Sequence, residues 1–372
     1  MFLRIIQIFV IVFLLIIFLP KISHAQLQDS RYEAKVTKIL EERSIKVSGK
    51  TQLYQKIELQ ITNGNLKDKK VIIESGKIPL SYLPKYKEAD TVFIVKTNVL
   101  GDKETFLITD FVRKTPIYIL LSIFVLLTIF IGRIRGALSL LGMAISFATI
   151  FIFVLPSIIS GKDPVFIAVA ASIFLIPITF YLSHGINGKT TSAVIGTVIA
   201  LVVTGILASV FADLVHLSGF SSDEASFVQT MSKGGLNMSG LLLAGIIIGM
   251  LGVLDDITIS QSAIVYKLKE TDVRLNFTEI WAKAMDIGKD HIASMVNTLV
   301  LVYTGASLPL LLLFVNSTVP FGDVLNYEML AEEIVRTLVG SIGLILAVPI
   351  TTFIASYLVD FKKNKLIFFR DK

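Results

Sequence analysis

Residues 240–266 read GLLLAGIIIGMLGVLDDITISQSAIVY. This stretch is apolar enough to cross a lipid bilayer, yet it carries the adjacent carboxyl groups of Asp255 and Asp256. A charged side chain at the centre of a membrane-spanning helix costs roughly 2.5–3.5 kcal/mol on insertion scales, so intramembrane carboxylates are rare and mark functional sites by default. The stretch therefore indicates a membrane protein and marks the first place to look for its function.

The composition of the whole chain also indicates a membrane protein. Apolar residues make up 53% of the 372 residues and charged residues 17%, whereas soluble domains carry about 25% charged residues. The net charge of +6 comes from basic residues spread over loops and one soluble segment, so no basic face of the kind that binds nucleic acid is expected. The chain contains no cysteine, which excludes thiol catalysis, disulfides and cysteine-ligated metal sites.

The first part of the chain is predicted to lie outside the cytoplasm. Residues 1–25 have the pattern of a signal peptide, with Arg4, an apolar run and the cleavage sequence Ser23-His24-Ala25. An uncleaved first span is the alternative. Residues 26–114 are the only long soluble stretch, with five short alternating segments separated by turn residues. They predict a small extracytoplasmic all-β domain, an OB-like barrel that serves as a spacer or docking module.

Residues 115–360 predict an α-helical integral membrane domain of seven transmembrane helices. Each apolar stretch is close to the ~20 residues that cross a hydrocarbon core of ~30 Å. The predicted spans are residues 117–131, 137–159, 165–183, 191–212, 236–254, 292–315 and 334–359. Residues 361–372 form a basic tail.

The basic residues of the connections predict the orientation, because cytoplasmic loops of membrane proteins are richer in Lys and Arg than outer loops. With residues 26–114 outside, the outer connections hold Lys162, Lys233 and Arg336. The inner segments hold the larger basic set, which is Arg133, Arg135, Lys189, Lys267, Lys269, Arg274, Lys283, Lys289, Lys362, Lys363, Lys365, Arg370 and Lys372. We therefore expect a multi-pass plasma-membrane protein with a cytoplasmic C-terminus.

Polar side chains gather at the inner ends of the fifth and sixth predicted spans. On a helix, Asp255, Thr258 and Ser262 share one face, and Asp290, Ser294 and Asn297 share another. If the two helices pack face to face, these groups meet near the inner membrane boundary. The candidates for binding a proton or an ion are Asp255, Asp256, Gln261, Lys289, Asp290, His291 and Asn297.

The depth of the acidic pair is left open by the sequence. If the fifth span ends at Asp255, the pair lies at the membrane interface. The apolar pattern continues to Leu268, however, and a tilted or broken helix would place the pair inside the membrane. Small residues on the same helix, with Gly245 and Gly249 four positions apart, predict close contact with a neighbouring helix.

The chemistry of a buried acidic pair suits proton or cation binding. A carboxyl group kept away from water binds a proton more readily, and a neighbouring carboxylate adds to this effect. His291 and Lys289 are then expected to act as counter-charges or relay groups. A divalent metal site made of Asp255, Asp256, Asp290, His291 and His184 is an alternative, although the sequence contains no ligand spacing specific to a metal. We therefore predict no metal.

No enzyme motif accompanies these residues. The sequence contains no nucleophile elbow, phosphate-binding glycine loop or H-E-x-x-H motif. We therefore predict that the protein is not an enzyme and that it needs no cofactor.

Four blocks of sequence resemble the YibE/F-like bacterial integral membrane proteins. They are GMLGVLDDITISQ (residues 249–261), GKDHIASMVNTLVLVYTGASLPLLLLF (288–314), RTLVGSIGLILAVPITT (336–352) and TDFVRKTP (109–116). The resemblance implies a multispanning plasma-membrane protein with an extracytoplasmic domain, and it implies no reaction. The acidic pair after a glycine-rich run, followed by a polar helix with Asn297 and Thr298, is also similar to resistance–nodulation–division transporters and to SecD and SecF. That similarity implies carboxylates that carry protons, although the span count differs and the large paired periplasmic domains are missing.

Two main functions remain open. The first is a permease or transport-associated protein that uses Asp255 and Asp256 as a protonatable or ion-binding pair. The second is a non-transport scaffold, whose outer domain docks a partner and whose spans assemble with another membrane protein. A membrane-embedded enzyme is a third hypothesis and has no motif behind it. The expected partners are the lipid bilayer and a membrane protein or a second copy of the chain, with no nucleic acid.

Overall fold

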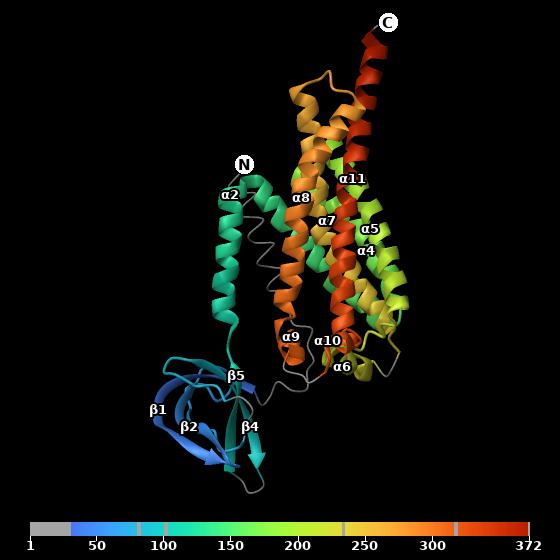
Figure 1. Cartoon of the computed structure of the whole chain (residues 1–372). Coiled ribbons are helices and arrows are strands. Elements are labelled where there is room, and N and C mark those ends of the chain that lie inside the picture. Colours follow the sequence, from blue (N-terminus) through green and yellow to red (C-terminus); the bar gives the residue numbers. More distant parts are fainter. Residues whose placement is uncertain (1–30, 80–82, 100–102, 233–234, 316–318, 371–372) are drawn as a thin grey trace. The chain divides into compact units, whose positions relative to one another are not determined.

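The computed structural model describes residues 31–79, 83–99, 103–232, 235–315 and 319–370. The predicted signal peptide, residues 1–25, lies outside the described residues. The chain forms two compact units, of which one ends at Leu127 and the other continues from Thr128. Figure 1 shows the strands of the first unit and the helices of the second.

The first unit contains an antiparallel sheet of five strands in the order β3-β2-β1-β4-β5. Successive strand side chains point to opposite faces, and alternate apolar positions here bury one face in a common core. Strands β3 and β5, at the two ends of this order, also contact each other. The all-β prediction is thus confirmed, with strands β1 (Arg31–Val47), β2 (Lys50–Ile61), β3 (Lys70–Ser75), β4 (Thr91–Val99) and β5 (Lys103–Phe111).

The buried side-chain amide of Gln55 on β2 bonds to the irregular segment that contains Tyr86. Gln55 is 1% exposed, and its side chain accepts a hydrogen bond from the Tyr86 N–H at 2.9 Å and donates to the Tyr86 carbonyl at 3.0 Å. It also donates to the Glu42 carboxylate at 3.0 Å. The hydrogen bond from Lys85 holds the pKa of Glu42 below its usual value.

Replacing this amide is expected to loosen the β domain. In Gln55→Leu, the N–H and carbonyl of Tyr86 lose their partner, and a buried unpaired polar group costs about 1–3 kcal/mol. Amide hydrogen exchange of β1 and β2 in the full-length protein should become faster. The control is Gln60→Leu, five residues further along β2, because the Gln60 side chain donates to the Asp68 carboxylate at 3.3 Å at the surface. Equal exchange rates in the two variants would contradict this account.

The rest of the chain is helical. Its elements are α2 (Lys114–Thr149), a π-helical turn η2 (Ile150–Val154), α3 (Leu155–Ile159), α4 (Pro164–His184), α5 (Gly188–Leu214), α6 (Asp223–Met231), α7 (Met238–Thr271), α8 (Phe277–Ala306), α9 (Leu308–Val315), α10 (Phe321–Val324) and α11 (Glu328–Arg370). Side chains of Asp163, Asn187, Asn237 and Asn276 cap α4, α5, α7 and α8 by accepting from an N–H of the first turn.

These helices confirm an apolar, membrane-embedded bundle. Among the described residues, five helical stretches are long and apolar enough to cross a membrane: residues 114–159, α4, α5, α7 and residues 328–360. The pair α8 and α9, bent by 69° at its junction, is a sixth candidate. The described helices thus give five to six candidate spans where the sequence predicts seven.

A break inside α2 accounts for part of this difference. Arg133 has a φ of 51° and a ψ of −130°, which is not a helical conformation. A Cβ placed on Gly136 would lie 2.2 Å from the carbonyl oxygen of Thr128, whereas residues eight positions apart on a straight helix are about 12 Å apart. The chain therefore turns sharply at Arg133, where the sequence predicts a loop between two spans.

Helices α5 and α11 interlock through two glycines. A Cβ on Gly196 of α5 would lie 2.3 Å from the Thr351 hydroxyl of α11. In the reverse sense, a Cβ on Gly343 of α11 would lie 2.2 Å from the Thr204 hydroxyl of α5. The close contact predicted along Gly245 and Gly249 is wrong, because in the described chain nothing lies within 4 Å of either Cβ position. Those two glycines lie on an exposed side of α7.

The two kinds of glycine should respond differently to substitution. Gly196→Val inserts methyl groups where Thr351 already packs, and overpacking of this kind costs about 1–3 kcal/mol. We expect a lower melting temperature in size-exclusion measurements after heating. Gly245→Val has the same helical cost but meets open space, so it serves as the control. A Gly245 variant that melts as early as the Gly196 variant would show that the interlock is unimportant.

Candidate functional site

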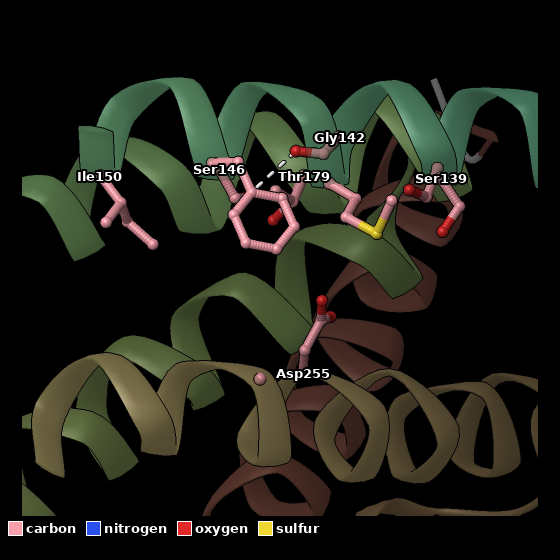
Figure 2. Close-up of a pocket in the computed structure, with 10 residues that line it drawn as sticks. Ser139, Gly142, Ser146, Ile150, Thr179 and Asp255 are labelled. Carbon is pink, nitrogen blue, oxygen red and sulfur yellow. Dashed lines mark hydrogen bonds between the residues drawn. The ribbon is translucent and has the colours of Figure 1, made fainter. Parts of the chain in front are cut away.

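Asp255 faces a cavity within the helical unit. The cavity has a volume of about 340 Å³, and its lining comes from α2, η2, α4 and α7: Ser139, Gly142, Met143, Ser146, Phe147, Ile150, Thr179, Ser183, Gly252 and Asp255. Figure 2 shows the Asp255 side chain rising from α7 toward Thr179 and the α2 helix. A second cavity of about 200 Å³ shares Ser146, Ile150, Thr179, Gly252 and Asp255 with the first and adds Ser172.

Three of the five hydroxyl groups that line the two cavities around Asp255 donate their protons on their own helices. Ser146 donates to the carbonyl of Gly142 at 3.1 Å, Thr179 to that of Leu175 at 2.9 Å, and Ser172 to that of Ala168 at 2.8 Å. A hydroxyl has one proton and two acceptor lone pairs, so each of these oxygens can still accept. An ionised carboxylate also only accepts. The described lining contains no Lys, Arg or His, so the cavity suits a proton or a cation and does not suit an anion.

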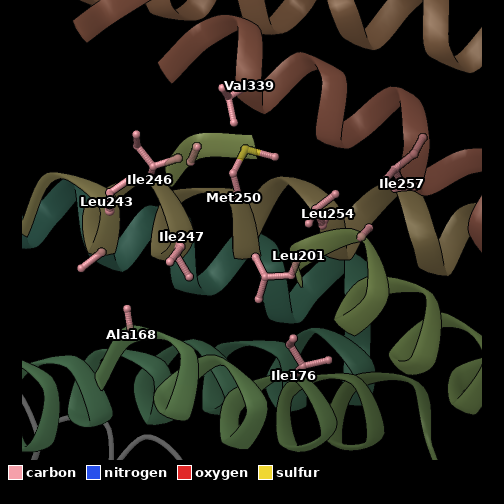
Figure 3. Packing of buried hydrophobic residues seen from close by; sticks show 14 of the residues in the cluster. Ala168, Ile176, Leu201, Leu243, Ile246, Ile247, Met250, Leu254, Ile257 and Val339 are labelled. Atoms are coloured by element: carbon pink, nitrogen blue, oxygen red, sulfur yellow. The ribbon is translucent and has the colours of Figure 1, made fainter. Parts of the chain in front are cut away.

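Packing of α7 on three neighbouring helices fixes the position of Asp255. Met250, Leu254 and Ile257 of α7 are almost fully buried, in a cluster that includes residues of α4, α5 and α11. Figure 3 shows Met250 directed toward Val339 of α11, with Leu201 of α5 on the other side. The opposite side of α7 is left free for the cavity, where Gly252 precedes Asp255 by one turn and has no atom near its Cβ position.

The two acidic neighbours have different surroundings. Asp255 is partly buried, whereas Asp256 is exposed on the surface of the unit and does not line the cavity. Consecutive residues on a helix point about 100° apart, so the two side chains leave α7 in different directions, and Asp255 is the one that lines the cavity. Thr258 and Ser262, which the helical spacing groups with Asp255, instead bond to α5: Thr258 to the Thr197 hydroxyl at 2.6 Å and Ser262 to the Lys189 carbonyl at 2.7 Å.

Gln261 connects three helices away from the cavity. Its side-chain N–H groups donate to the Ala284 carbonyl of α8 at 2.8 Å and to the Thr352 hydroxyl of α11 at 2.8 Å. Its carbonyl oxygen is buried and has no partner among the described residues. A Cβ on Gly288 would lie 3.0 Å from the amide nitrogen, so this glycine lets α8 approach the amide closely. Gln261 therefore joins α7, α8 and α11 and does not contribute to the cavity lining.

The sequence model of the YibE/F-like proteins matches residues 120–361. The chain belongs to the YibE/F-like family. The matched region contains the whole cavity lining and Gln261, while the β domain lies before it. No curated protein and no solved structure matches the chain.

The remaining candidates of this YibE/F-like protein lie on α8 and do not reach Asp255. Lys289 is exposed and lies 3.6 Å from the Asp286 carboxylate, Asp290 and Asn297 are exposed, and His291 is partly buried. None of the four lines either described cavity around Asp255. Within the described residues, no group of three His, Asp or Glu side chains is placed to hold a metal ion.

Ser139, Ser146 and Thr179 are the site residues that the sequence analysis missed. Each is a single hydroxyl residue within an apolar stretch, and hydroxyl residues of membrane helices commonly bond to their own backbone. Nothing local distinguishes the hydroxyls that also face a carboxylate on another helix. The sequence signal for these residues is that hydroxyl side chains occur in two neighbouring predicted spans. This signal becomes informative only when the packing of those spans is known.

The access to Asp255 can be tested with an apolar carbodiimide, which modifies protonated carboxyl groups. We expect modification of Asp255 in the wild-type protein and several-fold less in Gly252→Leu, because the new side chain fills the space beside the carboxyl group. Gly245→Leu lies two turns earlier on the same exposed side of α7 and is the control. Peptide mapping by mass spectrometry gives the extent of modification at Asp255. Equal modification in both variants would show that the reagent does not enter through the cavity.

Proposed function

We propose that this YibE/F-like protein is a permease or transport-associated protein of the plasma membrane, in which Asp255 binds and releases a proton or a small cation. The observation that carries the proposal is a partly buried carboxylate that faces a cavity lined by apolar side chains and by the hydroxyls of Ser146 and Thr179, between helices of membrane-spanning length. Asp256 is proposed to act from outside the cavity, as a neighbouring negative charge that attracts cations.

The energetics of the cavity favour alternation between an empty and an occupied state. An ionised carboxylate away from bulk water is unstable by several kcal/mol unless it is paired. In the described residues, no donor to the Asp255 carboxylate is found. A bound proton or cation removes this cost, and the hydroxyl oxygens of Ser146 and Thr179 replace part of the water shell of a cation. The described lining contains no permanent positive charge that neutralises the carboxylate. The bound proton or cation takes this role and can leave again.

We propose seven spans with the β domain outside and the C-terminus in the cytoplasm. Two observations support the count: the break at Arg133 divides residues 114–159 into two helices, and the bent pair α8 and α9 forms one broken span. The basic residues of the predicted inner loops support the orientation. Contact between β3 and β5 supports an OB-like closure of the outer domain.

A flux measurement tests the transport proposal. Purified full-length protein in liposomes is given a membrane potential, and proton or sodium uptake is followed with an internal dye. Interactions with a charged partner are worth about 1.5–3 kcal/mol, so Asp255→Asn should lower the apparent cation affinity about 10-fold or more. Asp256→Asn should have a smaller effect.

The matched control is Asp213→Asn, because Asp213 is an exposed carboxylate at the end of α5 and lies outside both described cavities. Its variant should retain wild-type flux. If Asp255→Asn and Asp213→Asn transport equally well, Asp255 is not the binding group and the proposal fails.

A non-transport scaffold is the second candidate. Large apolar side chains of the β domain are exposed on β3 and β5, including Ile72 and Leu107, and exposed apolar side chains are common at docking surfaces. In this case a partner protein should co-purify with the wild type and be lost with Ile72→Ser and Leu107→Ser, while Asp255→Asn has no effect on its recovery.

A further inference from the structure

Charged and titratable side chains from four helices gather at one end of the cavity around Asp255. The lining residues Ser139 of α2 and Ser183 of α4 lie at this end, and Ile150 lies at the other end of the α2 side of the lining (Figure 2). One charged residue each on α2, α5 and α7 acts electrostatically on the imidazole at the end of α4. We call these four residues the mouth of the cavity: Arg135, His184, Lys189 and Asp256.

The mouth residues lie next to the cavity lining along their own helices. His184 directly follows Ser183, and Arg135 precedes Ser139 by about one helical turn. Arg135, His184 and Asp256 are exposed. Charged side chains at the end of a membrane helix lie where water is present, because hydrocarbon excludes them. Water therefore meets the His184 imidazole one residue away from the lining of the cavity.

The opposite end of the path is closed by apolar side chains. The second cavity continues from the first, and apart from Ser172 its additional lining residues are Val154, Ala171, Leu175, Ile248 and Leu251. Val154 and Ala171 are buried in an apolar cluster with Ile158 and Ile167, and Ile248 packs against that cluster. A polar species that comes from water therefore has its route to Asp255 through the mouth.

The charges of the mouth favour a proton over a metal cation. Arg135 and Lys189 are permanently positive near neutral pH, whereas Asp256 supplies a single negative charge. A sodium ion would have to pass both positive groups as a full charge and would be repelled by them. A proton can cross by exchange, because an imidazole takes up a proton on one ring nitrogen and releases one from the other. With an ordinary pKa of about 6.5, imidazoles do this near neutral pH.

We propose that His184 transfers protons between the water at the mouth and Asp255, and that a proton is the occupant of the Asp255 cavity. This inference rests on the proposed function and on the proposed orientation, which puts the mouth on the cytoplasmic side. It replaces His291, the relay that the sequence suggests, with a histidine that lies beside the cavity.

The transfer is balanced in atoms and charge. In the loading step, an N–H bond of the His184 imidazolium breaks and an O–H bond forms on a water molecule in the cavity. That water passes one of its protons on to the Asp255 carboxylate. The imidazolium becomes neutral, and the carboxylate becomes a neutral acid. The cavity volume of about 340 Å³ has room for several water molecules at about 30 Å³ each. The negative charge of Asp256 stabilises the imidazolium before the transfer.

Proton uptake into liposomes by the full-length protein tests the relay. His184→Ala should lower the proton flux about 100-fold, the lower end of what a positioned proton-transfer group contributes. Added imidazole should restore much of this flux, because it replaces a missing proton carrier and does not repair a misfolded protein. The control is His291→Ala, because His291 lies on α8 and lines neither described cavity. This variant should keep the wild-type flux.

The outcomes separate this inference from the proposed function. A His184→Ala flux equal to that of the wild type, or a loss that imidazole does not restore, overturns the relay. If Asp255→Asn abolishes the flux in the same experiment, the proposed function survives that result. Wild-type uptake of sodium without protons overturns the proton as occupant. A wild-type protein that moves neither ion contradicts both proposals.

Thiol labelling tests the one-sided opening without measuring transport, because the native chain contains no cysteine. Ser183 lines only the first cavity, beside the mouth, whereas Ser172 lines only the second and is 1% exposed. A charged, membrane-impermeant thiol reagent added from the cytoplasmic side should label Ser183→Cys and leave Ser172→Cys unlabelled. Equal labelling of the two variants, including no labelling of either, shows that the mouth is not the way to Asp255.

Discussion

The absence of water around a membrane bundle is the constraint on which the rest of the structure depends. Polar atoms inside the helical unit have to find partners within the protein, because hydrocarbon offers none. Hydroxyl groups meet this requirement by donating to the carbonyl one turn earlier, as Thr197, Thr204 and Ser172 do. Longer side chains meet it across helices, as Gln261 does with Ala284 and Thr352. Satisfied polar groups therefore hold the helices together.

Asp255 is one exception to this pattern, in addition to the buried Gln261 carbonyl and the Thr351 and Ser356 hydroxyls, which have no partner among the described residues. The hydroxyls of Ser146 and Thr179 donate to their own helices, so these two groups offer lone pairs and no protons to the carboxylate. A structural role would be better served by a donor such as Asn or Arg opposite the carboxylate. A carboxylate without a donor gains stability when a proton or a cation binds to it. The proposed role of Asp255 thus follows from the same physical rule that stabilises the bundle.

The sequence predicts those features that depend on composition and periodicity. Apolar content, alternation in residues 31–111 and the sequence blocks that resemble the YibE/F-like proteins are enough for the membrane class, the β domain and the family. Periodicity gives the buried side of each helix but not the helix that it meets. For this reason the spacing predicts a meeting of Asp290 and Asn297 with Asp255, whereas in the structure α8 turns its apolar side inward. Gly245 was likewise expected in a contact that Gly196 makes.

Helix α8 does not line the described cavities around Asp255, but it is connected to the helix that carries this residue. Gln261 is on α7, less than two turns beyond Asp255, and its amide bonds to the backbone of α8 at Ala284. Because Gly288 packs against the same amide, α8 cannot rotate about its axis without displacing or breaking this bond. The orientation of α8 and the position of α7 next to Asp255 are therefore coupled through the buried side chain of Gln261.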